Sequence, residues 1–341
     1  MSRTHSIKAV LKRGALLAAA NWPVVAVQLV AETTFKVLLA VPLVGAAILL
    51  TVLLGADIGE LMQGSLRDIF TTIASALMSE PVALVAFMCA FSVVLLGGAV
   101  LLFLVKGGTV TVLAAGNEVA GEIERPPLRL AAVERAGQFS LDRFTSGCAR
   151  LFRPYLKLGL LLMVVYGLSV GLYLLALVST YRAAGDRVAL VSFTLTAALA
   201  GAGLVIWLTI VNLLYLLTQM AIAVDGHGVR ASFGSIARFI RADLRELSSV
   251  FGVVVGLVLL AAAASALAWS GVGLIAFVPV VGLAVLPLQL AALLVRGVVF
   301  EYLGLTALGA YLSLYRRYQA RAGDVRQAAP VRSSSTLSPS T

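Results

Sequence analysis

The sequence predicts an all-α integral membrane protein with six transmembrane helices, arranged as three hairpins with interfacial amphipathic elbow helices. Three observations support this fold class. The chain is 60% hydrophobic and only 12% charged, whereas soluble domains carry roughly 25% charged residues. It contains apolar runs long enough to cross a hydrocarbon core of ~30 Å. Its Lys and Arg residues gather in alternate segments between these runs.

The apolar runs predict the spans. They are apolar on every face, which favours helices, because barrel strands alternate apolar and polar residues. The fourth run would be about 55 Å long as a helix, so we expect it to tilt or to extend beyond the bilayer. Residues 56–80, between the first two runs, are expected to form a short outer helix. The six runs cover residues 37–55, 81–105, 158–178, 188–224, 249–268 and 272–295.

The distribution of charge predicts the orientation. Of the 26 Lys and Arg residues, 23 lie in the first, third, fifth and seventh segments around the runs, which are net +12, whereas the other segments are net −2. Cytoplasmic loops carry an excess of Lys and Arg, so both termini are expected in the cytoplasm. A bias toward Arg, Ala, Val, Leu and Gly is typical of a GC-rich bacterial genome, and we therefore expect a bacterial cytoplasmic (inner) membrane. The net charge of +10 reflects topology and indicates no nucleic-acid partner.

Three regions are predicted along the chain. Residues 1–36 form a cytoplasmic or interfacial amphipathic segment, 37–321 form the six-helix membrane domain, and 322–341 form a disordered cytoplasmic tail rich in Ser, Pro and Ala. Within the first region, Pro23 is expected to kink or start a helix. We interpret residues 14–35 as an interfacial or partly re-entrant helix. The alternative is one tilted helix that extends from Pro23 into the first span.

Basic amphipathic segments precede the hairpins. In residues 233–250, apolar side chains recur at helical spacing while Arg238, Arg241 and Arg245 form another stripe. Residues 139–153 show the same pattern, with Arg150 and Arg153 among their cations. Such helices lie in the head-group plane with their apolar face toward the acyl chains. Their arginines are therefore predicted to bind anionic lipid head groups of the cytoplasmic leaflet. Pro154 is expected to break the helix before the third span.

Polar side chains expected at membrane depth form a second candidate site. Glu32 and Lys36 are four residues apart, so they face the same side of a helix and form either a snorkelling interfacial pair or an intramembrane functional pair. Asn212, Tyr215 and Gln219 share a face of the fourth run. They either line a polar cavity or form hydrogen bonds between helices.

Two further patterns concern packing and the membrane boundary. Gly167-x-x-x-Gly171 and Gly252-x-x-x-Gly256 permit close approach of helix backbones. Residues 300–318 combine tyrosines with Arg316 and Arg317, which is typical of a membrane–water boundary. These aromatics would serve as ordinary interfacial anchors or bind a lipid head group.

Enzymatic motifs are absent from the sequence. It contains no GxSxG, P-loop or HExxH pattern. His227, in the turn Asp225-Gly226-His227-Gly228, has neither a nearby second His nor a Cys cluster that would complete a metal site. We therefore predict no catalytic, cofactor or metal site.

Residues Met220–Leu244, MAIAVDGHGVRASFGSIARFIRADL, carry a resemblance. A long span leads to the turn Asp225-Gly226, followed by Ala231, Phe233, Ser235 and Arg238 on an interfacial helix. This arrangement resembles bacterial six-helix proteins like the membrane domain of glycerophosphoryl diester phosphodiesterases and related uncharacterised families. The resemblance implies a six-helix fold. It transfers no functional residue and no phosphodiesterase activity.

Taken together, the sequence favours a non-enzymatic multi-pass membrane protein that interacts with lipid or assists transport or envelope assembly. The alternative is a small transporter or permease subunit with a polar path built from Glu32, Asn212, Tyr215 and Gln219. A membrane-embedded enzyme would need converging titratable groups, which the sequence does not indicate.

Overall fold

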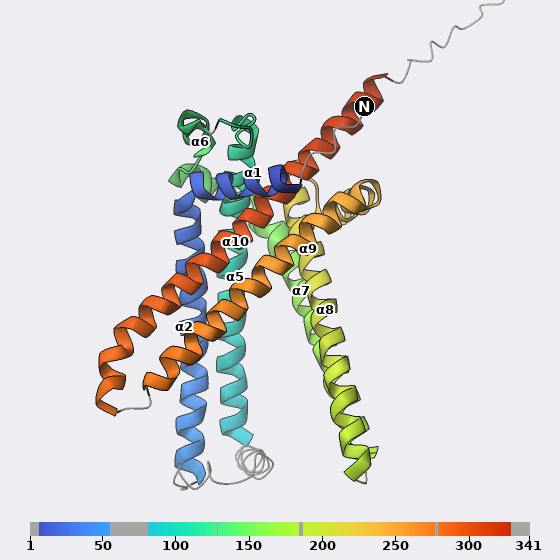
Figure 1. Cartoon of the computed structure of the whole chain (residues 1–341). Helices are drawn as coiled ribbons and strands as arrows, with labels where there is room; N and C mark the ends of the chain where they lie inside the picture. The colour runs from blue at the N-terminus through green and yellow to red at the C-terminus, as the bar shows by residue number, and fades with distance from the viewer. Residues whose placement is uncertain (1–6, 55–80, 128, 184–186, 277–278, 329–341) are drawn as a thin grey trace, which may run out of the picture. The chain divides into compact units, whose positions relative to one another are not determined.

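The computed structural model describes residues 7–54, 81–127, 129–183, 187–276 and 279–328, which are helical almost throughout (Figure 1). Six helices of this described part are long and apolar enough to cross a membrane, which confirms the predicted fold class. Their large apolar side chains remain exposed, as at Val93 (70%) and Leu260 (67%), and lipid is the solvent that suits such a surface. The helices are α1 (Ile7–Ala20), α2 (Trp22–Leu54), α5 (Pro81–Val119), α6 (Leu130–Ala136), α7 (Leu141–Ala183), α8 (Arg187–Asp225), α9 (Val229–Ala276) and α10 (Pro279–Ala328).

The chain forms two compact units, and helices α5 and α8 each contribute residues to both. Unit 1 comprises Met1–Asn21, Leu113–Gln138 and Leu216–Thr341. Unit 2 comprises Trp22–Val112 and Phe139–Tyr215.

Unit 2 contains two of the predicted hairpins. Gln28 of α2 donates a hydrogen bond to Thr109 of α5 (2.9 Å), and Phe35 packs against Gly98, so the two helices run antiparallel. In the second hairpin, Trp207 of α8 donates to Ser169 of α7 (3.0 Å). Helix α5 also packs closely on α7, because Gly107 and Gly108 lie against Leu151, Cys148 and Phe144.

Unit 1 is built around α10, which contacts α1 and α9. Gly14 of α1 lies directly on α10, where an added Cβ would meet the Thr306 carbonyl oxygen and come within 2.8 Å of the Ala310 nitrogen. Tyr302 of α10 donates its hydroxyl to the Ala15 carbonyl oxygen (3.0 Å). The two helices therefore touch backbone to backbone, and the hydroxyl satisfies a carbonyl of α1 at the contact.

The break between α1 and α2 falls at Asn21, which is fully buried. Its amide nitrogen donates to the Leu17 carbonyl (3.0 Å) and to the Ala136 carbonyl at the end of α6 (2.9 Å). Its amide oxygen accepts from the Gln138 backbone nitrogen (2.8 Å). Pro23 then lies in the first turn of α2, where its missing N–H costs nothing. The expectation that Pro23 starts a helix is confirmed.

The preferred interpretation of residues 14–35 as a separate helix is wrong. Residues 14–20 belong to α1, and α2 continues unbroken for 33 residues from Trp22 to Leu54, as the alternative predicted. The expected region boundary at residue 36 thus lies within α2. Glu32 and Lys36 do not interrupt the helix because they form an i,i+4 pair on it.

The bends before the third and fifth spans do not lie where the sequence predicts them. Helix α7 continues through Pro154 without a break, so the predicted break there is wrong. Proline is tolerated inside membrane helices because neighbouring groups satisfy the backbone atoms that it frees. Helix α9 instead leaves helical geometry at Asp243 (φ −125°, ψ 28°). The elbow segment before the fifth span is therefore 229–242, shorter than the predicted 233–250.

Close backbone approach occurs at other glycines than those predicted. An added Cβ at Gly167, Gly171, Gly252 or Gly256 would meet nothing within 4 Å among the described residues. The two Gly-x-x-x-Gly motifs therefore do not mediate helix contacts within the described chain. Their spacing only permits close approach, and it does not select which face of a helix is covered.

The region after residue 321 was expected to be disordered, but α10 continues to Ala328. Extending an existing helix adds a hydrogen bond for each ordered residue without a new nucleation cost. Residues 329–341 and the predicted outer helix in 56–80 lie outside the described residues.

The contact at Gly14 generates a testable prediction. Gly14→Ala should destabilise the protein by about 1–3 kcal/mol, because a methyl group would force α1 away from α10. The matched control Gly252→Ala adds a methyl group into open space and should leave stability unchanged or raise it, since alanine favours helices. The measurement is thermal unfolding of the full-length protein in mild detergent, followed by tryptophan fluorescence. Equal unfolding temperatures for the two variants would contradict the described contact.

Candidate functional site

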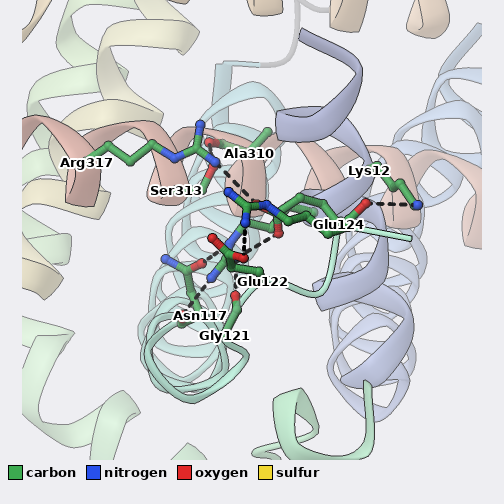
Figure 2. Close-up of polar contacts among 10 residues, drawn as sticks. Lys12, Asn117, Gly121, Glu122, Glu124, Ala310, Ser313 and Arg317 are labelled. Atoms are coloured by element: carbon green, nitrogen blue, oxygen red, sulfur yellow. Dashed lines mark hydrogen bonds and ion pairs between the residues drawn. The ribbon is translucent and has the colours of Figure 1, made fainter. Parts of the chain in front are cut away.

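Arg13 of α1 is the centre of a polar cluster in unit 1, and Figure 2 shows its partners Asn117, Gly121 and Glu124. Its Nε donates to the Asn117 side-chain oxygen (2.8 Å) and its Nη2 donates to the Asn117 carbonyl (3.0 Å). Its Nη1 donates to the Gly121 carbonyl (2.5 Å) and to Glu124 Oε2 (2.9 Å). The side chains of Arg13 and Glu124 are only 12% and 8% exposed. The Arg13 guanidinium is therefore held in one orientation by protein acceptors.

The end of α5 supplies those acceptors. Gly121 adopts a positive φ of 60°, which turns the chain away from the helix axis and leaves the last carbonyl groups without intrahelical donors. Cations are favoured at this negative end of a helix dipole. Lys12 also donates to the Glu124 backbone carbonyl (3.0 Å), so two adjacent cations of α1 fasten the loop after α5.

Helix α10 contributes Arg316 and Arg317 to the same cluster. Arg316 pairs with Glu118 of α5. Arg317 lies 3.6 Å from Glu124, which is longer than a hydrogen bond, and its Nη1 is buried with no hydrogen-bond partner among the described residues. These arginines line a hollow of about 320 Å³ together with Arg13 and Arg125, three glutamates, Asn117 and Ser313.

A second polar cluster joins the turn between α8 and α9 to α10. Asp225 accepts from the Tyr315 hydroxyl (2.6 Å) and from Gln319 Nε2 (2.5 Å), and its side chain is only 7% exposed. Gly226 adopts a positive φ of 67° and ends α8, which confirms the predicted tight turn. At the bend of α9, Asp243 accepts from Arg321 (2.6 Å). Residues of α10 thus bind the two aspartates that flank the α9 elbow.

The predicted head-group arginines are exposed. Arg150 and Arg153 lie on α7, and Arg238, Arg241 and Arg245 lie on α9. Arg238 donates to the Gly234 carbonyl and to Ser235 of its own elbow (3.3 and 3.4 Å). Solvent or a membrane surface can therefore reach all five guanidinium groups.

The apolar face of the α9 elbow is divided between protein and solvent. Ile236 and Phe239 are buried, and the Phe239 ring contacts Tyr315 edge-on at 5.3 Å and Tyr318 at 5.4 Å. Phe233 and Leu244 remain exposed. The expectation that the whole stripe faces acyl chains is wrong, because its centre packs against α10.

The same outcome applies to two other predicted interfacial groups. Phe144 and Leu151 of α7 are buried and lie against the glycines of α5. Tyr311 and Tyr315 of α10 are also buried, so they are core residues of unit 1 and not interfacial anchors. Amphipathic spacing is the same whether lipid or protein covers the apolar face of a helix. The spacing alone therefore does not predict which of the two covers it.

The predicted intramembrane polar residues have different surroundings. Lys36 and Glu32 form an ion pair (2.8 Å) with exposed side chains (70% and 43%). Asn212 is exposed, whereas Tyr215 and Gln219 are buried. The Lys106 ammonium lies 5.4 Å from the centre of the Tyr215 ring, a cation–π contact between α5 and α8.

Sequence reasoning missed Arg13, Asn117, Glu124 and Arg317 as a group. They come from three segments with no fixed spacing, so no local pattern joins them. The available signal was the concentration of acidic residues at 118–124, in the basic segment after the second apolar run, since buried carboxylates need cationic partners.

No metal centre is evident in the described part of the chain, where no group of three or more His, Cys, Asp or Glu side chains is placed to hold an ion. Comparison with known proteins found no match among protein-family models, curated proteins or solved structures. The resemblance of Met220–Leu244 to the membrane domain of glycerophosphoryl diester phosphodiesterases therefore stays a prediction.

The buried ion pair predicts a large effect for Arg13. Arg13→Met should destabilise the protein by about 3 kcal/mol, because it leaves Glu124 buried without its main partner. Arg125→Met is the matched control, since its pair with Glu122 is 51% and 60% exposed and should contribute less than about 1 kcal/mol. The measurement is the free energy of unfolding in detergent. The double variant Arg13→Met/Glu124→Leu should recover much of the loss, and a loss as large as that of Arg13→Met alone would argue against a charge-driven effect.

Tyr315→Phe should lower the free energy of unfolding by about 2 kcal/mol, because Asp225 loses a hydrogen bond to its charged carboxylate. The control Tyr318→Phe keeps the ring contact with Phe239 and removes no donor from Asp225. Chemical unfolding of both variants tests the difference. A loss in Tyr318→Phe as large as that in Tyr315→Phe would show that the hydrogen bond to Asp225 does not account for the effect.

Proposed function

We propose that this multi-pass membrane protein is non-enzymatic and binds anionic phospholipid head groups through its exposed arginines. The observation that carries the proposal is the exposure of Arg238 and Arg241 on the elbow and of Arg245 directly after the bend at Asp243. Apart from the elbow's own Gly234 and Ser235, no acceptor competes for them in the described structure. Guanidinium groups in this state bind lipid phosphates through charge-assisted hydrogen bonds.

The position of the elbow supports the proposal. It is the polar extension of an apolar helix of 48 residues, far longer than the ~20 residues that a span needs. Asp243 bends the chain where this extension meets the span, and Arg321 binds the Asp243 carboxylate. Exposed Phe233 and Leu244 provide apolar side chains next to the arginines, which is the composition of an interfacial helix.

We further propose that the membrane is a bacterial cytoplasmic membrane, with both termini and the basic segments in the cytoplasm. In this location the protein would be an accessory to transport or envelope assembly that uses lipid contact to hold its orientation. The smaller outer segments, net −2, carry little of the charge that such lipid binding requires. Binding is therefore proposed for the leaflet that faces the basic segments.

The proposal predicts that removal of the three α9 arginines reduces the preference of the protein for anionic over zwitterionic lipid. Because each juxtamembrane cation contributes about 1 kcal/mol, Arg238→Gln/Arg241→Gln/Arg245→Gln should weaken phosphatidylglycerol binding on the order of 100-fold at low salt. Native mass spectrometry of the purified protein, titrated with phosphatidylglycerol and phosphatidylcholine, measures the preference.

A matched pair of single variants serves as the control. Arg241→Gln should weaken phosphatidylglycerol binding several-fold, whereas Arg182→Gln, an exposed arginine at the far end of α7, should not. Raising the salt concentration should reduce the difference, since exposed charges are screened. If the triple variant kept the full preference for phosphatidylglycerol, the proposed function would be abandoned.

A further inference from the structure

The hollow beside Arg13 has the composition of a site for a small charged group. Its volume of about 320 Å³ is at the lower end of the range for ligand pockets. Charged or polar side chains line it throughout. An acyl chain would therefore desolvate these groups without replacing their hydrogen bonds, which is unfavourable. The occupant that suits this lining is polar and compact.

The charges of the lining residues favour an occupant of negative charge. Each of its three glutamates already has an arginine partner: Glu118 pairs with Arg316, Glu122 with Arg125 (2.5 Å), and Glu124 with Arg13 (2.9 Å). The lining has four arginines and three glutamates, so its net charge is +1, and Arg317 is the arginine in excess. An additional cation would have to displace an arginine, whereas an anion would supply the missing countercharge.

Arg13 and Arg317 differ in how firmly they are held. Arg13 makes four hydrogen bonds to protein acceptors and has no capacity to reorient. Arg317 approaches Glu124 only at 3.6 Å, its side chain is 27% exposed, and its Nη1 has no hydrogen-bond partner in the described chain. Buried donors are nearly always satisfied in folded proteins. The Arg317 guanidinium thus pairs with Glu124 only at 3.6 Å and keeps a buried Nη1 that lacks an acceptor among the described residues, in the lining of a hollow large enough to hold one.

We propose that this hollow binds one phosphate-type oxyanion, with Arg317 as its main ligand and the exposed N–H groups of Arg125 and Arg316 as additional donors. A planar guanidinium matches two phosphate oxygens at once, and the neighbouring arginines reach the remaining ones. The group is either free phosphate or the phosphate of a lipid head group. This site uses none of the α9 arginines, so it goes beyond the proposed function and is independent of it.

The experiment is a calorimetric titration of the full-length protein in a non-ionic detergent at constant ionic strength, with inorganic phosphate and dihexanoyl phosphatidic acid as separate probes. We expect saturable one-to-one binding of at least one probe. Arg317→Gln should weaken that binding at least about 10-fold, since it removes charge-assisted hydrogen bonds. Arg241→Gln, which lies outside the hollow, should change it less than about twofold. Arg317→Lys keeps the charge without the planar donor pair and should give an intermediate loss.

The possible outcomes distinguish free phosphate from a lipid head group, and they test the hollow separately from the α9 arginines. Similar affinities for both probes identify phosphate itself as the ligand, and tighter binding of the lipid identifies a head group. Absence of saturable binding to the wild-type protein overturns the proposal without reliance on any variant. Equal affinity in a folded Arg317→Gln protein also overturns it. Loss of phosphatidylglycerol preference in the α9 variants, with phosphate binding unchanged, would support both proposals. Full phosphatidylglycerol preference in those variants, with phosphate binding unchanged, would reject the proposed function alone.

Discussion

The buried ion pair between Arg13 and Glu124 is the interaction on which the polar part of unit 1 depends. Removing a guanidinium from water costs several kcal/mol unless acceptors surround it. The chain supplies them from the end of α5 and from the loop that follows, more than 100 positions away along the sequence. The residue after Arg13 is Gly14, which lets α1 lie directly on α10. The glycine and the arginine are thus two parts of one arrangement.

Charge in this protein has two structural roles that the sequence does not separate. Arg13, Arg316 and Arg321 pair with acidic side chains of other segments, so their charge is neutralised within the protein. In the described part of the chain, Arg238 of α9 donates only to Gly234 and Ser235 of its own helix. The net +12 of the basic segments therefore overstates the charge that a membrane can bind, and the orientation that it indicates stays a prediction. Only burial and pairing show which cations remain available.

The sequence predicts those parts of the fold that a single local pattern determines. Long apolar runs imply spans because lipid satisfies no backbone group, and Gly226 after Asp225 indicates a turn for steric reasons. Prediction failed where two environments favour the same pattern. The stripe that contains Ile236 and Phe239 suits acyl chains and protein equally, and its centre is covered by tyrosines of α10. The candidate site was not predictable because its residues come from separate segments and become neighbours only after α1 packs on α10.

Helix α10 connects these features because successive residues face different directions, about 100° apart for each position. Tyr315 and Gln319, four residues apart, share the face that binds Asp225. Arg316 and Arg317 lie between them in sequence, but they point toward Glu118 and Glu124. The face that holds the α8–α9 turn is thus distinct from the face that lines the hollow. A substitution at Arg317 alters the hollow while the hydrogen bonds to Asp225 stay in place, so the two roles of this helix are separable by mutation.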